Sequence, residues 1–376
     1  MNWQKFKLDV IEYSKTIGID KIGFTTSTTF DEMKIRLLHQ QRLQYHSGFE
    51  EPDIDKRVDP SLLMDEPRSI ISIALAYPSK MKVRVVSKKG ERRGIFCRAS
   101  WGTDYHVILR DRLKKLEKYI LSRIPNATLK SMVDTGELVD RAVAQRAGIG
   151  WSGKNCSIIT PEFGSYVYLG EMITNIPFEP DTPMEDLCGT CNKCVDICPT
   201  GALVQGGQLN AQKCIAFLTQ TKGFLPDEFR GKLGNRIYGC DTCQTVCPKN
   251  KGMDYHLHVE MEPDPEIAKP LLKPLLRMSN REFKEKFGHI SGSWRGKKPI
   301  QRNAIIALAH YKDDTAIDEL KFVLIDDPRP VIRGTAAWAL GKIGGNSAKD
   351  ALLKAQRSEK DESVQLEIEK GLGFFK

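Results

Sequence analysis

Two short cysteine runs constrain this 376-residue chain more than any other feature of its sequence. The first run reads CGTCNKCVDICP, and the second reads GCDTCQTVCP. Closely spaced thiolates followed by a Cys-Pro pair are typical of proteins that hold two [4Fe–4S] clusters, where the last cysteine of each run binds the other cluster. The spacing therefore predicts a module that holds two iron–sulfur clusters.

The spacing also assigns ligands to each cluster. The second run lacks its first cysteine, because Ile237 stands three residues before Cys240. The only cysteine between the runs is Cys214, which we therefore assign to the second cluster. The predicted ligands are Cys188, Cys191, Cys194 and Cys247 for cluster 1, and Cys198, Cys214, Cys240 and Cys243 for cluster 2.

Zinc is the main alternative occupant, but zinc ribbons use two Cys-x-x-Cys pairs at a wide separation rather than a nearly repeated triplet. A disulfide framework suits short secreted chains, and this long chain does not belong to that class.

The N-terminus, MNWQKFKLDVIEYSKTIGID, carries charges throughout and predicts an amphipathic helix rather than an export signal. No stretch reaches the apolar length that a bilayer requires. We expect a cytoplasmic protein with no membrane partner. Its net charge of +9 suggests a polyanionic binding partner.

Two proline-rich connectors, IPFEPDTPMEDL and MEPDPEIAKPLLKP, divide the chain into three predicted domains. Residues 1–177 alternate helical and strand-like segments and predict an α/β domain. Its expected strands include Ser69–Tyr77 and shorter pieces at 157–159 and 166–169, and Tyr105–Ile124 has the spacing of a surface helix. Residues 178–255 form the ferredoxin-like module, and residues 256–376 form an all-α domain.

The C-terminal domain repeats internally. Leu308, Leu340 and Leu372 share one register at 32-residue intervals, within NAIIALAHY, TAAWALGKI and LEIEKGLGFF. Small residues packed with Leu and Ile on paired helices predict an α-solenoid of HEAT-like type, with about two repeats.

A third group of residues lies in the α/β domain. Asp134 follows the apolar pair Met132-Val133, at the expected end of a strand, and a helix is expected over 141–147. In this interpretation, the loop GIGWSGKN that follows exposes its backbone groups to a ligand. On pattern alone, an Asp at a strand end is more often a cap, and glycine loops are usually turns.

The order of these pieces is similar to that of the epoxyqueuosine reductase family. The resemblance rests on GTDYH at 102–106, on VDTGELVDRAVAQRAGIGWSGKN, on GSYVYLGE, and then on the cysteine runs and the HEAT-like tail. It implies a reductive-dehalogenase-like α/β domain that binds cobalamin, and two [4Fe–4S] clusters that feed electrons to Co(I). It also implies the last step of queuosine biosynthesis, the reduction of epoxyqueuosine to queuosine at the wobble position of tRNA.

The resemblance implies that Asp134 is the proton donor, and we expect burial against the corrin to raise its pKa. Cobalamin is expected in the base-off form without a histidine ligand, because Leu109 stands where an Asp-x-His-x-x-Gly box needs glycine. The cofactor-binding candidates are Arg57, Cys97, Tyr105, His106, Asp134, Lys154, Asn155 and Ser157.

Several of these candidates have simpler structural roles open to them. Cys97 could be a buried thiol, Arg57 an exposed loop cation, and Tyr105 and His106 caps of the following helix. The polar loop around His256 and His258 is expected to leave both histidines solvated.

A transfer RNA substrate needs cations for its phosphates, and two segments offer them. The tRNA-binding candidates are Lys222, Arg281, Lys284, Trp294, Arg295, Lys297 and Lys298, with Lys286 and Arg302 in the same stretch. A solvated turn before the solenoid is the alternative interpretation of this stretch. An electron donor such as flavodoxin or ferredoxin is also expected. Two other functions stay open, namely a cobalamin-dependent reductive dehalogenase and a ferredoxin-type electron carrier with a scaffolding tail.

Overall fold

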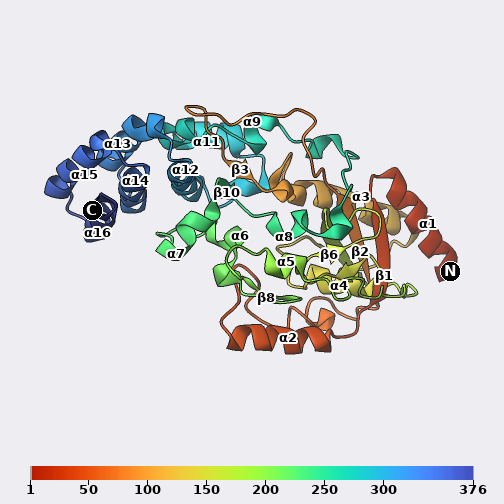
Figure 1. Ribbon diagram of the computed structural model, residues 1–376. Helices are drawn as coiled ribbons and strands as arrows, with labels where there is room; N and C mark the ends of the chain where they lie inside the picture. Colours follow the sequence, from red (N-terminus) through yellow and green to blue (C-terminus); the bar gives the residue numbers. More distant parts are fainter. Residues whose placement is uncertain (1, 376) are drawn as a thin grey trace. The chain divides into compact units, whose positions relative to one another are not determined.

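The structure, a computed structural model, describes residues 2–375, which form two compact units (Figure 1). The first unit comprises residues 2–80, 103–214 and 241–262, and the second comprises residues 81–102, 215–240 and 263–375. Each unit therefore combines segments that are distant in sequence. The division into three successive domains stays a prediction about the functional parts of the chain.

An antiparallel sheet forms the centre of the first unit, with its four strands in the order β1-β2-β7-β4. The predicted strand at residue 69 is confirmed as β2, and all eight of its residues are buried. A strand that is apolar on both sides needs cover on both faces of its sheet. The strands of this sheet are β1 (Lys21–Thr26), β2 (Ser69–Ala76), β4 (Leu129–Met132) and β7 (Val167–Thr174).

Helices α3 and α4 supply that cover on opposite faces. Successive residues of a strand point to opposite faces. A Cβ on Gly170 of β7 would lie 3.3 Å from Leu113 of α3, whereas Val167 and Leu169 pack in a cluster with Ala144 of α4. The helices of the first unit are α1 (Trp3–Thr16), α2 (Asp31–Arg42), α3 (Tyr105–Arg123), α4 (Asp140–Arg146), α5 (Lys193–Asp196) and α8 (Thr242–Thr245).

Short strand pairs complete the first unit and hold its loops. β5 (Trp151–Ser152) pairs with β6 (Ile158–Ile159), and β8 (Leu203–Gln205) pairs with β9 (Gln208–Leu209). The expected strand at 166 is confirmed as β7, which extends to Thr174.

A buried amide ties the second cysteine run to the sheet domain. Asn250 accepts a hydrogen bond from Ser165 N–H at 2.7 Å and donates one to Ser165 Oγ at 2.8 Å. Gly164 has φ +60°, and a Cβ there would lie 2.2 Å from Asn250 Oδ1, so this contact requires glycine. The segment after Cys247 is thus fixed just before β7.

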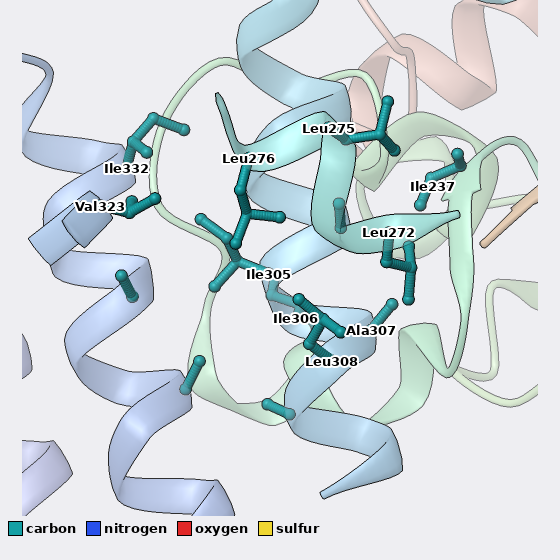
Figure 2. Packing of buried hydrophobic residues seen from close by; sticks show 14 of the residues in the cluster. Ile237, Leu272, Leu275, Leu276, Ile305, Ile306, Ala307, Leu308, Val323 and Ile332 are labelled. Carbon is teal, nitrogen blue, oxygen red and sulfur yellow. The ribbon is translucent and has the colours of Figure 1, made fainter. Parts of the chain in front are cut away.

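The second unit is mainly helical and also contains one short parallel strand pair, β3 (Ile95–Phe96) with β10 (Arg236–Tyr238). Its first helices are α6 (Ile215–Leu218), α7 (Asp227–Arg230), α9 (Pro265–Ala268), α10 (Leu272–Arg277) and α11 (Asn280–Phe287). Figure 2 shows Leu276 of α10 pointing toward Ile305 of α12 (Lys297–Tyr311), within one continuous apolar core.

The predicted internal repeat is confirmed as successive helices at the C-terminus. These are α12 (Lys297–Tyr311), α13 (Ile317–Asp326), α14 (Pro330–Ile343), α15 (Asn346–Ser358) and α16 (Glu362–Gly373). Leu308 and Leu340, in the repeated register, are completely buried. A Cβ on Gly341 would lie 2.3 Å from the carbonyl oxygen of Gly371, so small residues let α14 and α16 pack closely.

Within the described residues, no helix combines the length and the apolar composition that crossing a membrane requires.

A buried ion pair links α7 to α16 in the second unit. Arg230 donates to Glu367 Oε1 at 2.8 Å and to the Leu225 carbonyl, and both charged side chains are almost inaccessible. Removing one partner of such a pair leaves an uncompensated buried charge.

We predict that Glu367→Ala lowers the free energy of unfolding by about 3–5 kcal/mol. Denaturant unfolding followed by tryptophan fluorescence measures this loss, since Trp338 lies beside Arg230. The control is Glu362→Ala, an exposed position at the start of the same helix. Equal losses in the two variants would show that the buried pair contributes nothing of its own.

Candidate active site

Asp134 lies in the first unit, in the loop that joins β4 to α4. Its backbone has φ +51°, a left-handed conformation that Asp tolerates better than most residues. Its N–H donates a hydrogen bond to Asp140 Oδ2 at 3.0 Å. The Asp134 side chain is 58% exposed, so its carboxylate is accessible to a reactant.

Two residues at the start of α3 contact this carboxylate. Tyr105 Oη donates to Asp134 Oδ2 at 2.8 Å, and His106 Nε2 forms an ion pair with the same oxygen at 3.3 Å. The helix cap is supplied by Asp104, which accepts from the His106 N–H at 3.0 Å. The capping role that the sequence left open for Tyr105 and His106 therefore belongs to Asp104.

The expectation that burial against the corrin raises the pKa of Asp134 concerns the protein with its cofactor and stays a prediction, whereas the side chains around Asp134 act in the opposite direction. The His106 imidazole is the largest influence on Asp134 and lowers its pKa. Burial acts in the opposite direction, but the pKa of Asp134 stays below its ordinary value. Burial opposes protonation of His106, but its contacts with Asp104 and Asp134 outweigh it and raise the pKa of His106 to about 9. At neutral pH the proton of this pair resides on His106 and Asp134 is ionised.

An aromatic stack flanks the same carboxylate. The Tyr105 ring stacks on Tyr168 of β7, with ring centroids 4.6 Å apart and planes inclined by 8°. Tyr168 in turn lies against Tyr77, at 4.4 Å between centroids. The stack fixes the Tyr105 ring and so directs its hydroxyl toward Asp134.

Asn155 and Ser157 lie in one loop of the first unit. Asn155 is buried and accepts a hydrogen bond from the Ser157 N–H at 3.1 Å, while its Nδ2 has no partner among the described residues. A buried amide donor without an acceptor suits a ligand that presents carbonyl or phosphate oxygens, as the carboxamide-rich rim of cobalamin does. This part of the site therefore fits the cofactor that the family resemblance implies.

The neighbouring glycines do not expose backbone as expected. A Cβ on Gly150 would lie 2.3 Å from the Ile159 carbonyl, and one on Gly153 would lie 2.5 Å from the Ile159 side chain. These glycines allow close packing on β6 instead. Lys154 also differs from expectation, because its ammonium donates to the Gly189 carbonyl at 2.7 Å and to Asn192 at 3.1 Å. It ties the loop to the first cysteine run.

Arg57 and Cys97 are in different units. Arg57 is half-buried in the first unit, where the charges of Glu50, Arg141 and Asp140 act on it, so it is not a simple exposed loop cation. Cys97 belongs to the second unit and lies 3.2 Å from Ser100 Oγ.

The thiols proposed for cluster 1 are close enough to influence one another. Burial raises the pKa of Cys194, and the charges of Cys247 and Cys188 add to this effect. Burial also raises the pKa of Cys247, and the charges of Cys188 and Cys191 add to it. Thiolates that repel one another in this way require a cationic centre between them, as iron in a cluster provides. The residues therefore fit a cluster at this position.

Cys198, predicted for cluster 2, is prepared for ionisation by the backbone. Burial opposes the thiolate, but N–H groups of Leu203, Thr200 and Ala202 outweigh it and lower the pKa of Cys198. Among the described residues, no group of three or more His, Cys, Asp or Glu side chains is arranged to hold a single metal ion. His258 is not solvated as expected, because it is buried and bonded to Asp20 at 2.8 Å.

In the second unit, the two predicted RNA-binding segments meet. Trp294 Nε1 donates to the Gln220 side chain at 2.8 Å, and Arg295 donates to the Gln220 carbonyl at 3.2 Å, two residues before Lys222. Trp294 is nevertheless 53% exposed, and Lys222 is exposed. An aromatic face and cations are thus accessible side by side.

The remaining basic candidates differ in availability. Arg281 and Lys284 are exposed on α11, although Arg281 pairs with Glu285 at 2.8 Å. Lys298 is partly exposed, whereas the Lys297 ammonium donates to the Met278 carbonyl at 2.6 Å. Arg302 is a correction, since it is fully buried and bonds the carbonyls of Leu218, Thr221 and Gly223.

The sequence reasoning missed Asp104, Asp140 and Glu171. Asp104 and Asp140 each stand at the start of a helix, which is the usual signal of a cap and gave no reason to consider a site. Glu171 ends the motif GSYVYLGE, just beyond the strand predicted at 166–169, although a carboxylate beside such an apolar run is itself unusual.

We predict a strong pH dependence of the His106–Asp134 pair. The pKa of His106 in the folded protein lies above its ordinary value of 6.5. Protonated His106 therefore stabilises the folded protein fully below about pH 6.5, and this stabilisation is lost as the pH rises through about 9. Histidine-selective NMR of the protein with oxidised clusters should give His106 a pKa near 9. Asp134→Asn should lower that pKa, and Glu137→Gln, which changes another carboxylate of the same loop, should not. An unchanged His106 titration in Asp134→Asn would refute the pair.

Comparisons with known proteins match the whole chain. Family models match the 4Fe-4S double cluster binding domain at residues 187–250, epoxyqueuosine reductase QueG, DUF1730 at 57–135, and HEAT repeats at 296–373. Epoxyqueuosine reductase of Bacillus anthracis is 70% identical over 99% of this chain and 98% of its own length, and that of Bacillus subtilis is 69% identical over 100% and 97%.

Solved structures agree with these relatives. A crystal structure of epoxyqueuosine reductase with an epoxyqueuosine-modified stem loop of tyrosine tRNA is 69% identical, covers 99% of both chains and has a TM-score of 0.98. A structure of the Bacillus subtilis enzyme, 68% identical over both full chains with a TM-score of 0.98, has its Asp134 catalytic loop swung out of the active site. The predicted double-cluster module and HEAT-like repeats are confirmed. The chain belongs to the epoxyqueuosine reductase family of oxidoreductases.

Proposed function

We propose that this protein reduces epoxyqueuosine to queuosine at the wobble position of tRNA, the last step of queuosine biosynthesis. The observation that carries the proposal is the accessible Asp134 carboxylate, which Tyr105 and His106 hold, in the same unit as a loop whose buried amide donor, Asn155 Nδ2, has no partner among the described residues. The family relationship and the relative solved with a modified tRNA stem loop support the same substrate. This relationship also sets aside the dehalogenase and electron-carrier alternatives.

Asp134 is the proposed proton donor, with His106 as the source of the proton. Opening an epoxide leaves negative charge on its oxygen, which a positioned acid must neutralise. His106 carries a proton at neutral pH and lies 3.3 Å from Asp134 Oδ2, and Tyr105 binds the same oxygen. As charge develops on the substrate, the proton passes from His106 to the carboxylate and onward to the oxygen.

Cobalamin, proposed in its base-off form without a histidine ligand, would supply the strongly reducing metal centre that this reaction needs. The residues proposed to hold it are Asn155, Ser157, Tyr105 and His106, with Arg57 in the same unit. Lys154 positions their loop against the first cysteine run. Cys97 remains a proposed cofactor contact on the ground of the family resemblance alone.

The two cysteine runs are proposed to hold the clusters that supply single electrons. The mutual influence of Cys188, Cys191, Cys194 and Cys247 supports their assignment to cluster 1. The assignment of Cys198, Cys214, Cys240 and Cys243 to cluster 2 rests on the sequence spacing. A one-electron donor such as flavodoxin or ferredoxin is proposed to reduce them.

The tRNA backbone is proposed to bind the region around Lys222, Trp294 and Lys298 of the second unit. Cations neutralise phosphates, and an exposed indole offers a stacking face to an unpaired base. Arg281, Lys284 and Arg295 extend this basic region, whereas Arg302 is buried and takes no part.

We predict that Asp134→Asn lowers turnover of a modified tRNA stem loop by about 100-fold or more, because the amide cannot accept and deliver the proton. The variant should still bind cobalamin and tRNA, as measured by absorption and by filter binding. Glu137→Gln should keep full turnover. Normal turnover by Asp134→Asn would remove this residue from the chemistry.

Charge reversal tests the proposed RNA surface. Lys222→Glu combined with Lys298→Glu should weaken tRNA binding and reduce the salt dependence of log Kd by about 0.7 for each phosphate that the variant no longer neutralises. The control is Lys354→Glu, an exposed lysine on α15 of the same unit. If both proteins bind tRNA alike at every salt concentration, the RNA binds to another surface.

A further inference from the structure

Glu171 is a fully buried carboxyl group in the middle of the sheet of the first unit. It lies on β7 between Leu169 and Ile173, on the face that packs against α4, and it is 0% exposed. Its cross-strand neighbours are Ser72 of β2 and Met132 of β4. An isolated carboxylate in such surroundings is very unfavourable, so this group needs either a partner or a proton.

Glu171 has no hydrogen-bond donor among the described residues. In the same part of the chain, the hydroxyl of its neighbour Ser72 also has no partner. The group that interacts with Glu171 is another carboxyl, that of Asp140 at the start of α4. Two carboxyl groups in contact cannot both be ionised, and a shared proton converts their repulsion into a hydrogen bond.

The titration behaviour agrees with this geometry. Burial, reinforced by the charge of Asp140, raises the pKa of Glu171 well above its ordinary value. Burial, reinforced by the charge of Asp134, raises the pKa of Asp140 to about 6. At neutral pH the pair therefore carries one proton and one negative charge.

Asp140 connects this pair to Asp134. The Asp134 N–H donates to Asp140 Oδ2 at 3.0 Å, at the residue whose backbone has the left-handed conformation. A charged acceptor makes a stronger hydrogen bond than a neutral one. The bond therefore holds the loop that presents the Asp134 carboxylate to Tyr105 and His106.

Other charged groups face the pair from the surrounding elements. The half-buried Arg57 interacts with the charge of Asp140 and favours its ionised form, and Arg141 of α4 lowers the pKa of the neighbouring Asp134. In the β4–α4 loop, the charge of Asp134 raises the pKa of both Asp140 and Glu171, and the charge of Glu137 raises the pKa of Glu171. Among the described residues, none of these groups donates a hydrogen bond to Glu171.

We propose that Glu171 is a positioning residue, which shares a proton with Asp140 and so keeps Asp140 fixed as the acceptor that anchors the Asp134 loop. The inference rests on the proposed function only for the catalytic role of Asp134. In a solved structure of a relative, the Asp134 catalytic loop is swung out of the active site. Glu171 would favour the inward position without contacting the substrate.

The experiment compares Glu171→Leu and Glu171→Gln in the full-length protein loaded with its cofactors. Leucine removes the donor, so hydrogen–deuterium exchange in the peptide that contains Asp134 should rise by about tenfold or more. The kcat should fall with it while KM for the stem loop stays nearly constant. Glutamine can still donate to Asp140, so it should keep the loop protected. Because glutamine cannot lose its donor, it should also remove the loss of protection that the original protein shows at high pH, where Glu171 gives up its proton.

Matched controls keep the result interpretable. Ser72→Ala, at the neighbouring buried position, should leave both exchange and kcat unchanged. If Glu171→Leu does not fold, the comparison of Glu171→Gln with the original protein at high pH decides the question, and an equal loss of protection in the two proteins overturns the proposal. Unchanged exchange in a folded Glu171→Leu also overturns it. These exchange measurements stand whether or not Asp134→Asn abolishes turnover, so failure of the proposed function is distinguishable.

Discussion

The burial of β2 and β7 on both faces is the constraint on which the first unit depends. These two central strands need α3 on one side and α4 on the other, and this places the start of α3 and the β4–α4 loop where their side chains meet. Tyr105 and His106 reach Asp134 because the helix that carries them must cover the sheet. The site is thus a consequence of how the sheet is covered.

One polar group interrupts this apolar centre. Ile70 and Ile173 belong to one apolar cluster around α4, and Ala74 and Ala144 belong to another, with Glu171 at the boundary between them. A carboxyl group at this depth destabilises the fold unless it keeps a proton. Its presence behind the Asp134 loop is therefore better explained by the site than by stability, in keeping with the general concentration of perturbed groups near functional sites.

Electrostatics divides the acidic residues of this region into two kinds. Asp134 is ionised because His106 faces it, whereas Asp140 and Glu171 share a proton because burial inside the sheet and their mutual repulsion both disfavour a second negative charge. The three carboxyls lie close together, yet their environments push their pKa values apart. Such separation lets one group exchange protons with a reactant while the others hold a fixed geometry.

Much of this could be predicted from the sequence, because local spacing determines it. The cysteine intervals identify the double-cluster module, the continuous apolar run at residue 69 identifies a buried strand, and the 32-residue register identifies the helical repeats. The chain order of Asp134, the glycine loop and the cysteine runs was sufficient to indicate the family.

What the sequence could not decide depends on contacts between distant residues. The charge of Asp134 is set by His106 on another helix, the burial of Arg302 by carbonyls some 80 residues away, and the role of Glu171 by a carboxyl on a different element. Only the tertiary structure decides these, because a pKa and a burial depend on what surrounds a side chain in space.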